Sequence, residues 1–228
     1  GPLLASGRDG DVFEYGPDLV VRKARDGRSL EGEARIMEHV ASRGFPVPAI
    51  HDVRAAGSEI VMDRISGGSM VHRLERRPWT MAREARVLAE LHKQLHTIPA
   101  PDWLPRHPDG GDRVVHRDLH PLNVLYGTNG PVVIDWPNAV AGTEETDVAH
   151  TWLLIEGADT SDQPFLARAF APILKVPLAR FVVREFDRAA VVARLGDVAA
   201  ERDQDRNVRP NERRAVQRIV AREEARLR

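Results

Sequence analysis

The most informative stretch of the sequence is His116-Arg117-Asp118-Leu119-His120-Pro121-Leu122-Asn123, with Asp135 twelve residues further on, at the end of an apolar strand. Phosphoryl transfer needs one Asp that accepts or orients the attacking hydroxyl. It also needs an Asn and a second Asp as hard oxygen ligands for the magnesium that bridges the nucleotide phosphates. An apolar hairpin over 124–134 would return Asp135 to the side of Asn123. The spacing therefore predicts a phosphoryl-transfer site.

This pattern, His-x-Asp-x-x-x-x-Asn followed by Ile134-Asp135-Trp136, resembles the aminoglycoside phosphotransferase and choline kinase-like family, whose members are relatives of the protein kinases. The resemblance extends to Pro46-Val47-Pro48, to Leu91-His92-x-x-Leu95-His96, and to Asp147 at the start of an apolar helix. It covers most of the chain.

The resemblance implies the cofactors and the roles of the loop residues. Asp118 would be the catalytic base, and His116 would brace the loop. Asn123 and Asp135 would hold Mg2+, and ATP would be the phosphate donor.

Two groups of side chains could instead bind a transition metal. His116, Asp118 and His120 form one of them. The other is the pair His92 and His96, which are four residues apart on a predicted helix. Because this pair shares a helix face with apolar side chains, packing histidines are the simpler interpretation.

The first sixty residues predict a small antiparallel sheet that includes one helix. Turn signals rich in glycine and proline separate short apolar strands. The expected strands are 3–5, 11–15, 19–21, 49–53 and 59–62. The expected helix, 31–41, carries apolar residues at helical spacing and ends before Pro46.

The best internal boundary is Ile65-Ser66-Gly67-Gly68-Ser69, because a mainly helical pattern follows these small residues. A helix is expected from Thr80 to about His96, then short strands around charged loops, then helices to the end. The predicted fold is α+β and protein-kinase-like, with two lobes. Residues 3–64 would form an antiparallel-sheet N-lobe with one helix, and residues 65–228 a mainly helical C-lobe. Gly1-Pro2 is expected to be the remnant of a cleaved tag.

A nucleotide site is expected in the N-lobe. The hairpin tip from Ser6 to Val12 carries Gly7 and Gly10, where backbone N–H groups could approach the ATP phosphates. Two glycines in a hairpin are a weak signal, but this one opens the strand lobe. The backbone around Asp63, from Met62 to Ile65, is expected to bond adenine.

The third strand should supply one cation to the α- and β-phosphates, held by a Glu from the following helix. Arg22 and Lys23 compete for this role, and because they are adjacent on a strand they face opposite sides. The Val-x-Lys spacing favours Lys23. For the acidic partner, Glu33 is favoured over Glu31 by its distance from the Pro46-Val47-Pro48 stop.

Composition excludes several classes of function. A net charge of -1 from mixed charges gives no attraction to nucleic acid or membrane. The absence of cysteine removes disulfides and thiolate chemistry and agrees with a cytoplasmic location. No apolar run is long enough to span a bilayer.

Eleven residues separate Asp135 from Asp147, too few for the activation segment of a protein kinase. The expected acceptor is therefore a hydroxyl of a small molecule, with an aminoglycoside or sugar-like compound as first choice, and an aminoglycoside would imply antibiotic resistance. Glu156 and Asp159 are expected near its pocket. Choline or another amino alcohol is the alternative. A silent nucleotide-binding module and a metal-dependent hydrolase are the alternatives from other classes.

Overall fold

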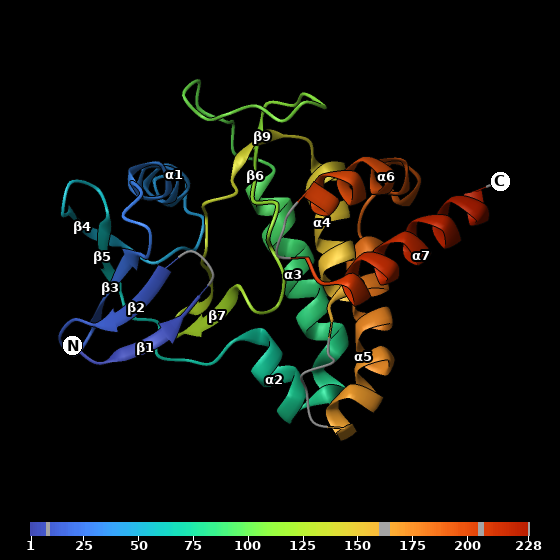
Figure 1. Ribbon diagram of the computed structural model, residues 1–228, viewed down its shortest axis with the longest axis horizontal. Helices are drawn as coiled ribbons and strands as arrows, with labels where there is room; N and C mark the ends of the chain where they lie inside the picture. The colour runs from blue at the N-terminus through green and yellow to red at the C-terminus, as the bar shows by residue number, and fades with distance from the viewer. Residues whose placement is uncertain (8–9, 160–164, 205–207, 228) are drawn as a thin grey trace. The chain divides into compact units, whose positions relative to one another are not determined.

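The computed structural model describes residues 1–7, 10–159, 165–204 and 208–227, except for the side chains of 165–172 and of 227. Contacts divide the chain into two compact units (Figure 1). The first unit comprises Gly1–Ser69 and Asn123–Ala139, and the second comprises Met70–Leu122 and Val140–Arg228.

The first unit is built on one antiparallel sheet with the strand order β1-β2-β3-β5-β4. Its elements are β1 (Leu3–Ser6), β2 (Gly10–Glu14), β3 (Leu19–Ala24), α1 (Glu31–Ala41), β4 (Ile50–Arg54), β5 (Glu59–Asp63), β7 (Val124–Gly127) and β8 (Gly130–Val133). The predicted sheet with one helix is confirmed.

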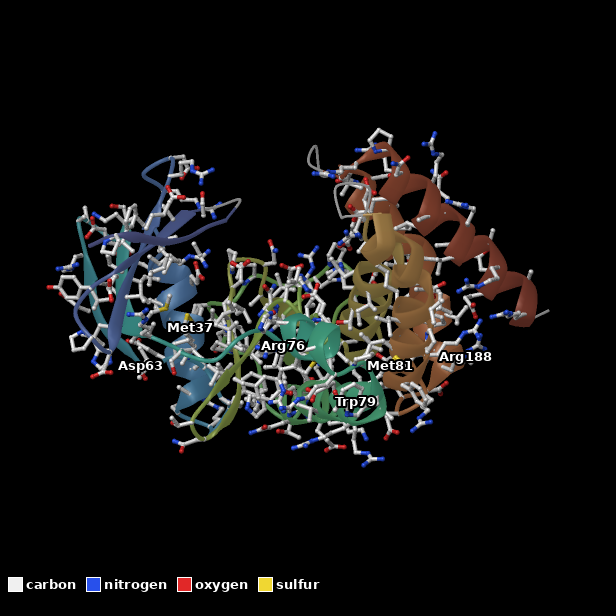
Figure 2. All side chains as sticks on the ribbon, turned by 90° about the horizontal axis from the view of Figure 1, so that it is seen from below. Met37, Asp63, Arg76, Trp79, Met81 and Arg188 are labelled. Carbon is white, nitrogen blue, oxygen red and sulfur yellow. The ribbon has the colours of Figure 1, made fainter. Side chains whose placement is uncertain are left out.

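Burial explains why these strands pair as they do. On β3 and β5 the central residues Val21 and Val61 are paired and almost fully buried. On α1, the residues Ile36, Met37 and Val40 recur at helical spacing and are buried too, so one apolar stripe of the helix faces the core. Figure 2 shows Met37 on this helix and Asp63 at the end of β5.

The hairpin β7–β8 belongs to the first unit, whereas the sequence assigned these residues to the C-lobe. Backbone bonds explain the difference. The N–H of Tyr126 donates to Gly68 O at 3.2 Å, and the N–H of Val133 donates to Pro46 O at 2.8 Å. A Cβ on Gly67 would lie 1.8 Å from Tyr126 O, so this approach requires glycine.

The second unit is mainly helical. Its elements are α2 (Met70–Arg76), η1 (Pro78–Thr80), α3 (Met81–Leu95), β6 (Arg113–Val115), β9 (Val140–Gly142), α4 (Glu144–Gly157), α5 (Phe165–Val183), α6 (Arg188–Gln204) and α7 (Pro210–Leu227). Trp79 of η1 is 77% exposed (Figure 2). In the part of the chain described, no helix combines the length and apolar character that crossing a membrane requires.

Helix α4 lies at the centre of this unit and packs against α5, α6 and α7. Because it is surrounded, it is buried on most of its circumference, and Val148, Ala149 and Leu153 are fully covered. Thr143 caps its N-terminus by accepting a hydrogen bond from the N–H of Thr146. The pairing of β6 with β9 and the short helices α2 and η1 were not predicted, since each is too short to carry a periodic pattern.

Candidate active site

The loop that carries Asp118 is held to α4 by two side chains one helical turn apart. Asp147 Oδ1 accepts a hydrogen bond from the N–H of Arg117 at 2.6 Å. Thr151 Oγ1 donates to Leu119 O at 2.6 Å. Asp118 lies between these two anchors, so its backbone is fixed on both sides by a buried helix.

The predicted loop brace is consistent with the contacts of His116. This side chain is fully buried, and its Nδ1 accepts a hydrogen bond from the N–H of Asp118 at 3.2 Å. His120 lies on the other side, with its Nε2 3.5 Å from Asp118 Oδ1 and its Nδ1 3.3 Å from the N–H of Leu122. His116 therefore uses a ring nitrogen to hold the loop backbone, which disfavours metal binding by this group.

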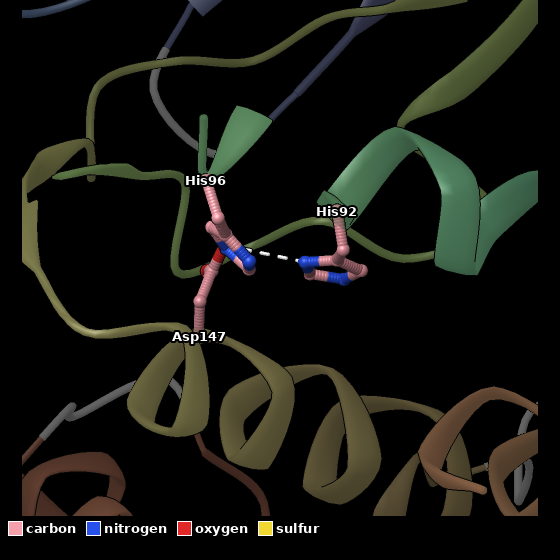
Figure 3. A group of neighbouring side chains, drawn as sticks. All are labelled: His92, His96 and Asp147. Atoms are coloured by element: carbon pink, nitrogen blue, oxygen red, sulfur yellow. Dashed lines mark hydrogen bonds and ion pairs between the residues drawn. The ribbon is translucent and has the colours of Figure 1, made fainter. Parts of the chain in front are cut away.

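Of the two helical histidines, His96 supports Asp147 by a hydrogen bond, and His92 lies beside the same carboxylate (Figure 3). His96 Nε2 donates to Asp147 Oδ2 at 2.9 Å, and His92 Nδ1 lies 3.3 Å from the same oxygen. On its other nitrogen, His96 contacts Glu144 at 3.3 Å. Burial lowers the pKa of His96, but hydrogen bonds to the two carboxylates outweigh it and raise that pKa to about 9.

His92 and His96 could in principle hold a metal ion with Asp147, because their ligand atoms lie close together. However, both ring nitrogens of His96 face carboxylates, so the ring is expected to carry two protons. His92 Nε2 is bonded to Thr151 Oγ1 at 2.9 Å. These histidines thus do more than pack: they orient the two α4 residues that hold the loop.

In the first unit, Arg22 joins two acidic side chains. Its Nη1 and Nη2 donate to Asp135 Oδ1 at 3.1 and 3.0 Å, and Nη1 lies 3.3 Å from Glu33 Oε1. Glu33 is buried, which raises the pKa of its carboxyl, although the positive charge of Arg22 opposes that rise. Glu33 Oε1 also accepts from the N–H of Trp136 at 3.4 Å.

This arrangement differs from the sequence-based prediction, which favoured Lys23 over Arg22 as the cation of the third strand. Lys23 Nζ pairs with Glu59 at 2.7 Å and not with Glu33. Neighbouring residues of a strand point to opposite faces, so the ion pair with Glu33 selects Arg22 and excludes Lys23 from this cluster. Between the two candidate glutamates, the contact supports Glu33 over the exposed Glu31.

Asn123 and Asp135 come together across the β7–β8 hairpin. The N–H of Ile134 donates to Asn123 O at 3.0 Å, one residue before Asp135. Asp135 has a positive φ of 70°, a conformation uncommon outside glycine and more frequent at functional sites. Both Arg22 bonds fall on Oδ1 of Asp135. An amide and a carboxylate oxygen are a donor set that fits Mg2+.

The predicted phosphate loop is only partly described, because Arg8 and Asp9 lie outside the described residues. The N–H of Gly7 donates to Gly10 O at 2.9 Å. A Cβ on Gly10 would lie 2.3 Å from Lys23 O, so glycine is required for the pairing of β2 with β3. Val12, also predicted to contact the nucleotide, is half-buried and pairs with Arg22 on β3.

The segment expected to bond adenine is already tied into the sheet. The N–H of Asp63 donates to Ala49 O at 3.0 Å, and the N–H of Arg64 donates to Asp18 O at 2.8 Å. The carboxylate of Asp63 accepts from His51 at 2.7 Å. A donor for adenine must therefore come from another backbone N–H of the segment, and this contact stays a prediction.

Glu156 was expected near an acceptor pocket, but its contacts do not support that role. It accepts from Trp152 Nε1 at 2.9 Å and pairs with Arg222 of α7 at 2.6 Å. Its side chain is 4% exposed. Asp159 lies 3.9 Å from Arg209. Glu156 thus holds α7 against α4.

Comparison with known proteins defines the class. A family model described as "Phosphotransferase enzyme family" matches residues 2–102 and 61–177, and the chain belongs to this family. No curated protein sequence is significantly similar to the chain.

Solved structures show the same fold at low sequence identity. A choline/ethanolamine kinase family protein from Mesorhizobium loti has a TM-score of 0.62 at 16% identity, over 99% of this chain and 87% of that one. A thermostable mutant of aminoglycoside phosphotransferase APH(4)-Ia has a TM-score of 0.66 at 15% identity, over 98% and 94%. The streptomycin–ATP ternary complex of APH(2")-IIa has a TM-score of 0.58 at 18% identity, over 89% and 86%. The predicted α+β, kinase-like fold is confirmed.

Proposed function

We propose that this protein transfers the γ-phosphate of ATP to a hydroxyl group of a small molecule. The observation that carries the proposal is the cluster of Arg22, Glu33 and Asp135, because it joins a strand cation to a helix glutamate and to a potential magnesium ligand. Family membership supports phosphoryl transfer in general. Solved structures of the same fold include a streptomycin–ATP ternary complex, an ADP-bound aminoglycoside phosphotransferase and a ternary complex with AMP-PNP and hygromycin B.

In this proposal each residue of the candidate site has its own role in phosphoryl transfer. Arg22 binds the nucleotide phosphates and is kept in place by Glu33. Asn123 and Asp135 would hold Mg2+, which would supply positive charge to neutralise the phosphates. Asp118 accepts the proton of the attacking hydroxyl. The anchors from Asp147, Thr151 and His116 keep the Asp118 backbone fixed during this step.

Aminoglycosides or sugar-like polyols are the proposed acceptors, and amino alcohols are the second candidate. The kinase-like structures that match this chain include an aminoglycoside phosphotransferase and a choline/ethanolamine kinase family protein. An ammonium cage of aromatic rings would favour amino alcohols, but aromatic residues make up only 5% of the chain. That low content favours polyols.

The test is to incubate the protein with labelled ATP and Mg2+ in the presence of separate panels of aminoglycosides, sugars, amino alcohols and generic protein substrates. Phosphorylated products are then identified by mass. Labelling of a small hydroxyl compound is expected. Labelling of protein alone would overturn the proposed acceptor class. No ATP turnover, with nucleotide binding retained, would favour a silent binding module, and tight stoichiometric zinc would favour a metal-dependent hydrolase.

A further inference from the structure

A second set of side chains, centred on one residue of α6, contacts the loop that carries Asp118, and the proposed chemistry does not use it. At its centre is Glu201, which lies 84 residues after Arg117 in the sequence. Its Oε2 accepts from Arg117 Nη2 at 2.6 Å, and its Oε1 accepts from His107 Nε2 at 2.6 Å. His150 of α4 lies 3.4 Å from Oε2. Three separate segments of the second unit therefore converge on one carboxylate.

Arg117 is the residue immediately before Asp118, and its backbone is unusual. Its φ is 63°, in the left-handed region that disfavours residues with a Cβ. This conformation persists only where the surroundings hold it. The N–H of Arg117 is held by Asp147 of α4, and its guanidinium is held by Glu201 of α6. Both ends of the residue are thus fixed by different helices.

The charges at this cluster favour an ion pair and disfavour a metal. Burial raises the pKa of the Glu201 carboxyl, but the hydrogen bond with His150 and the charge of Arg117 outweigh it and lower that pKa to about 2. Burial lowers the pKa of His150, so this ring is neutral at pH 7. His107, His150 and Glu201 are close enough to share a metal ion, but the guanidinium 2.6 Å from Glu201 would repel one.

We propose that Glu201 is a positioning residue for phosphoryl transfer: through Arg117 it holds the strained backbone before Asp118 and so couples α6 to the catalytic loop. This inference rests on the proposed function. It assigns Glu201 no contact with ATP or acceptor. Substitution of Glu201 should therefore lower kcat without weakening nucleotide binding. A general loss of folding would instead weaken both.

The test compares Glu201→Gln, which keeps the shape and removes the charge, with Asp197→Asn. Asp197 is an exposed residue one turn earlier on α6, so its substitution removes the same charge. A charge-assisted bond is about twice as strong as a neutral one, so Glu201→Gln is expected to lower kcat by roughly tenfold while the Kd for MgATP changes less than about twofold. Amide hydrogen exchange over 116–119 should become faster by a similar factor. Asp197→Asn should match the wild type in all three measurements.

Arg117→Gly provides the second arm, because glycine adopts the positive φ freely and removes the guanidinium. In that background Glu201→Gln should have little further effect on kcat or on exchange, as expected for two residues that act through one contact. The inference would be overturned if Glu201→Gln had the same amide exchange and kcat as Asp197→Asn. It would also be overturned if the effects of Arg117→Gly and Glu201→Gln were additive in the double variant. If the wild type phosphorylates no acceptor, the proposed function fails, whereas the exchange measurements still decide whether Glu201 positions the loop.

Discussion

Both terminal nitrogens of Arg22 donate to the same oxygen of Asp135, at 3.1 and 3.0 Å, while Nη1 also lies 3.3 Å from Glu33. A guanidinium shared by two carboxylates is held without using all of its donors, since Arg carries five N–H groups. Incoming phosphate oxygens could therefore replace Asp135 as the acceptor, which would release Asp135 to bind a metal ion.

The first prediction follows from this contact. Arg22→Ala is expected to weaken MgATP binding by tenfold or more, since charge-assisted bonds to phosphate are each worth about 1.5–3 kcal/mol. Lys23→Ala is the matched control, because Lys23 is a cation of the same strand that pairs with Glu59. Calorimetric titration with MgATP measures both. A larger loss in Lys23→Ala would return the phosphate role to Lys23.

Arg22→Ala also removes the guanidinium that pairs with the buried Glu33, which affects folding. Breaking a buried ion pair by removing one partner costs about 3–5 kcal/mol. The affinity of Arg22→Ala for MgATP is therefore measured only on protein that is shown to be folded. Arg22→Lys is the second variant, because it keeps a positive charge beside the buried Glu33. It should retain more stability than Arg22→Ala but lose part of the affinity for ATP, because an ammonium cannot form the planar two-pronged contact.

The second prediction concerns Asp118. Asp118→Asn is expected to lower kcat by about 10²–10⁴-fold, the usual contribution of a general base, and to leave ATP affinity unchanged. Coupled ADP release measures kcat. The control is Asp112→Asn, which changes a carboxylate of the same unit that is 80% exposed. Turnover close to that of the control would remove Asp118 from the mechanism.

The third prediction concerns the proposed magnesium ligands. Asn123→Ala and Asp135→Ala should weaken MgATP binding as well as turnover, because each removes a hard oxygen donor. Nucleotide titrations with and without Mg2+ separate the two contributions: the magnesium-dependent part of the affinity should fall by about tenfold or more. Asn129→Ala, at the exposed turn of the same hairpin, is the matched control for Asn123. Equal magnesium dependence in the variants and the wild type would contradict the assignment.

The sequence predicted the fold because the relevant signals are local, and the same local signals named most residues of the candidate site, whose roles stay predictions. The run from His116 to Asn123 is continuous, and alternation or helical spacing marks the strands and α1. The choice between Arg22 and Lys23 could not be made in this way. Both residues are cations on one strand, and only the position of Glu33 relative to the sheet distinguishes them.

Glu201 shows a different limit of sequence reasoning. It lies 84 residues from Arg117, and neither residue belongs to a pattern that includes the other. Similarly, the spacing of His92 and His96 was visible, but their bonds to Asp147 and Thr151 depend on how α3 packs against α4. Contacts between distant segments arise from tertiary packing, which short-range patterns do not encode.

The last prediction uses the raised pKa of His96, which moves from 6.5 to about 9 in the folded protein. The titratable groups that face it are Asp147, Glu144 and His92. The pKa values of both carboxyls are lowered, so they stay ionised, and that of His92 is lowered by burial, so this ring stays neutral above pH 6.5.

A raised pKa means that the folded protein binds the proton more tightly than the unfolded chain does. The stabilisation is thus complete below about pH 6.5 and is lost as the pH rises through about 9, by at most about 3 kcal/mol for a shift of this size. Urea unfolding at about pH 6, 7.5 and 9 measures this loss. His96→Gln, which cannot gain the proton, should be less stable than the wild type near pH 6, and the gap should narrow by pH 9. His72→Gln, at an exposed histidine of α2, should keep the pH dependence of the wild type. A gap between wild type and His96→Gln that is constant over this range would show that His96 is neutral in the folded protein.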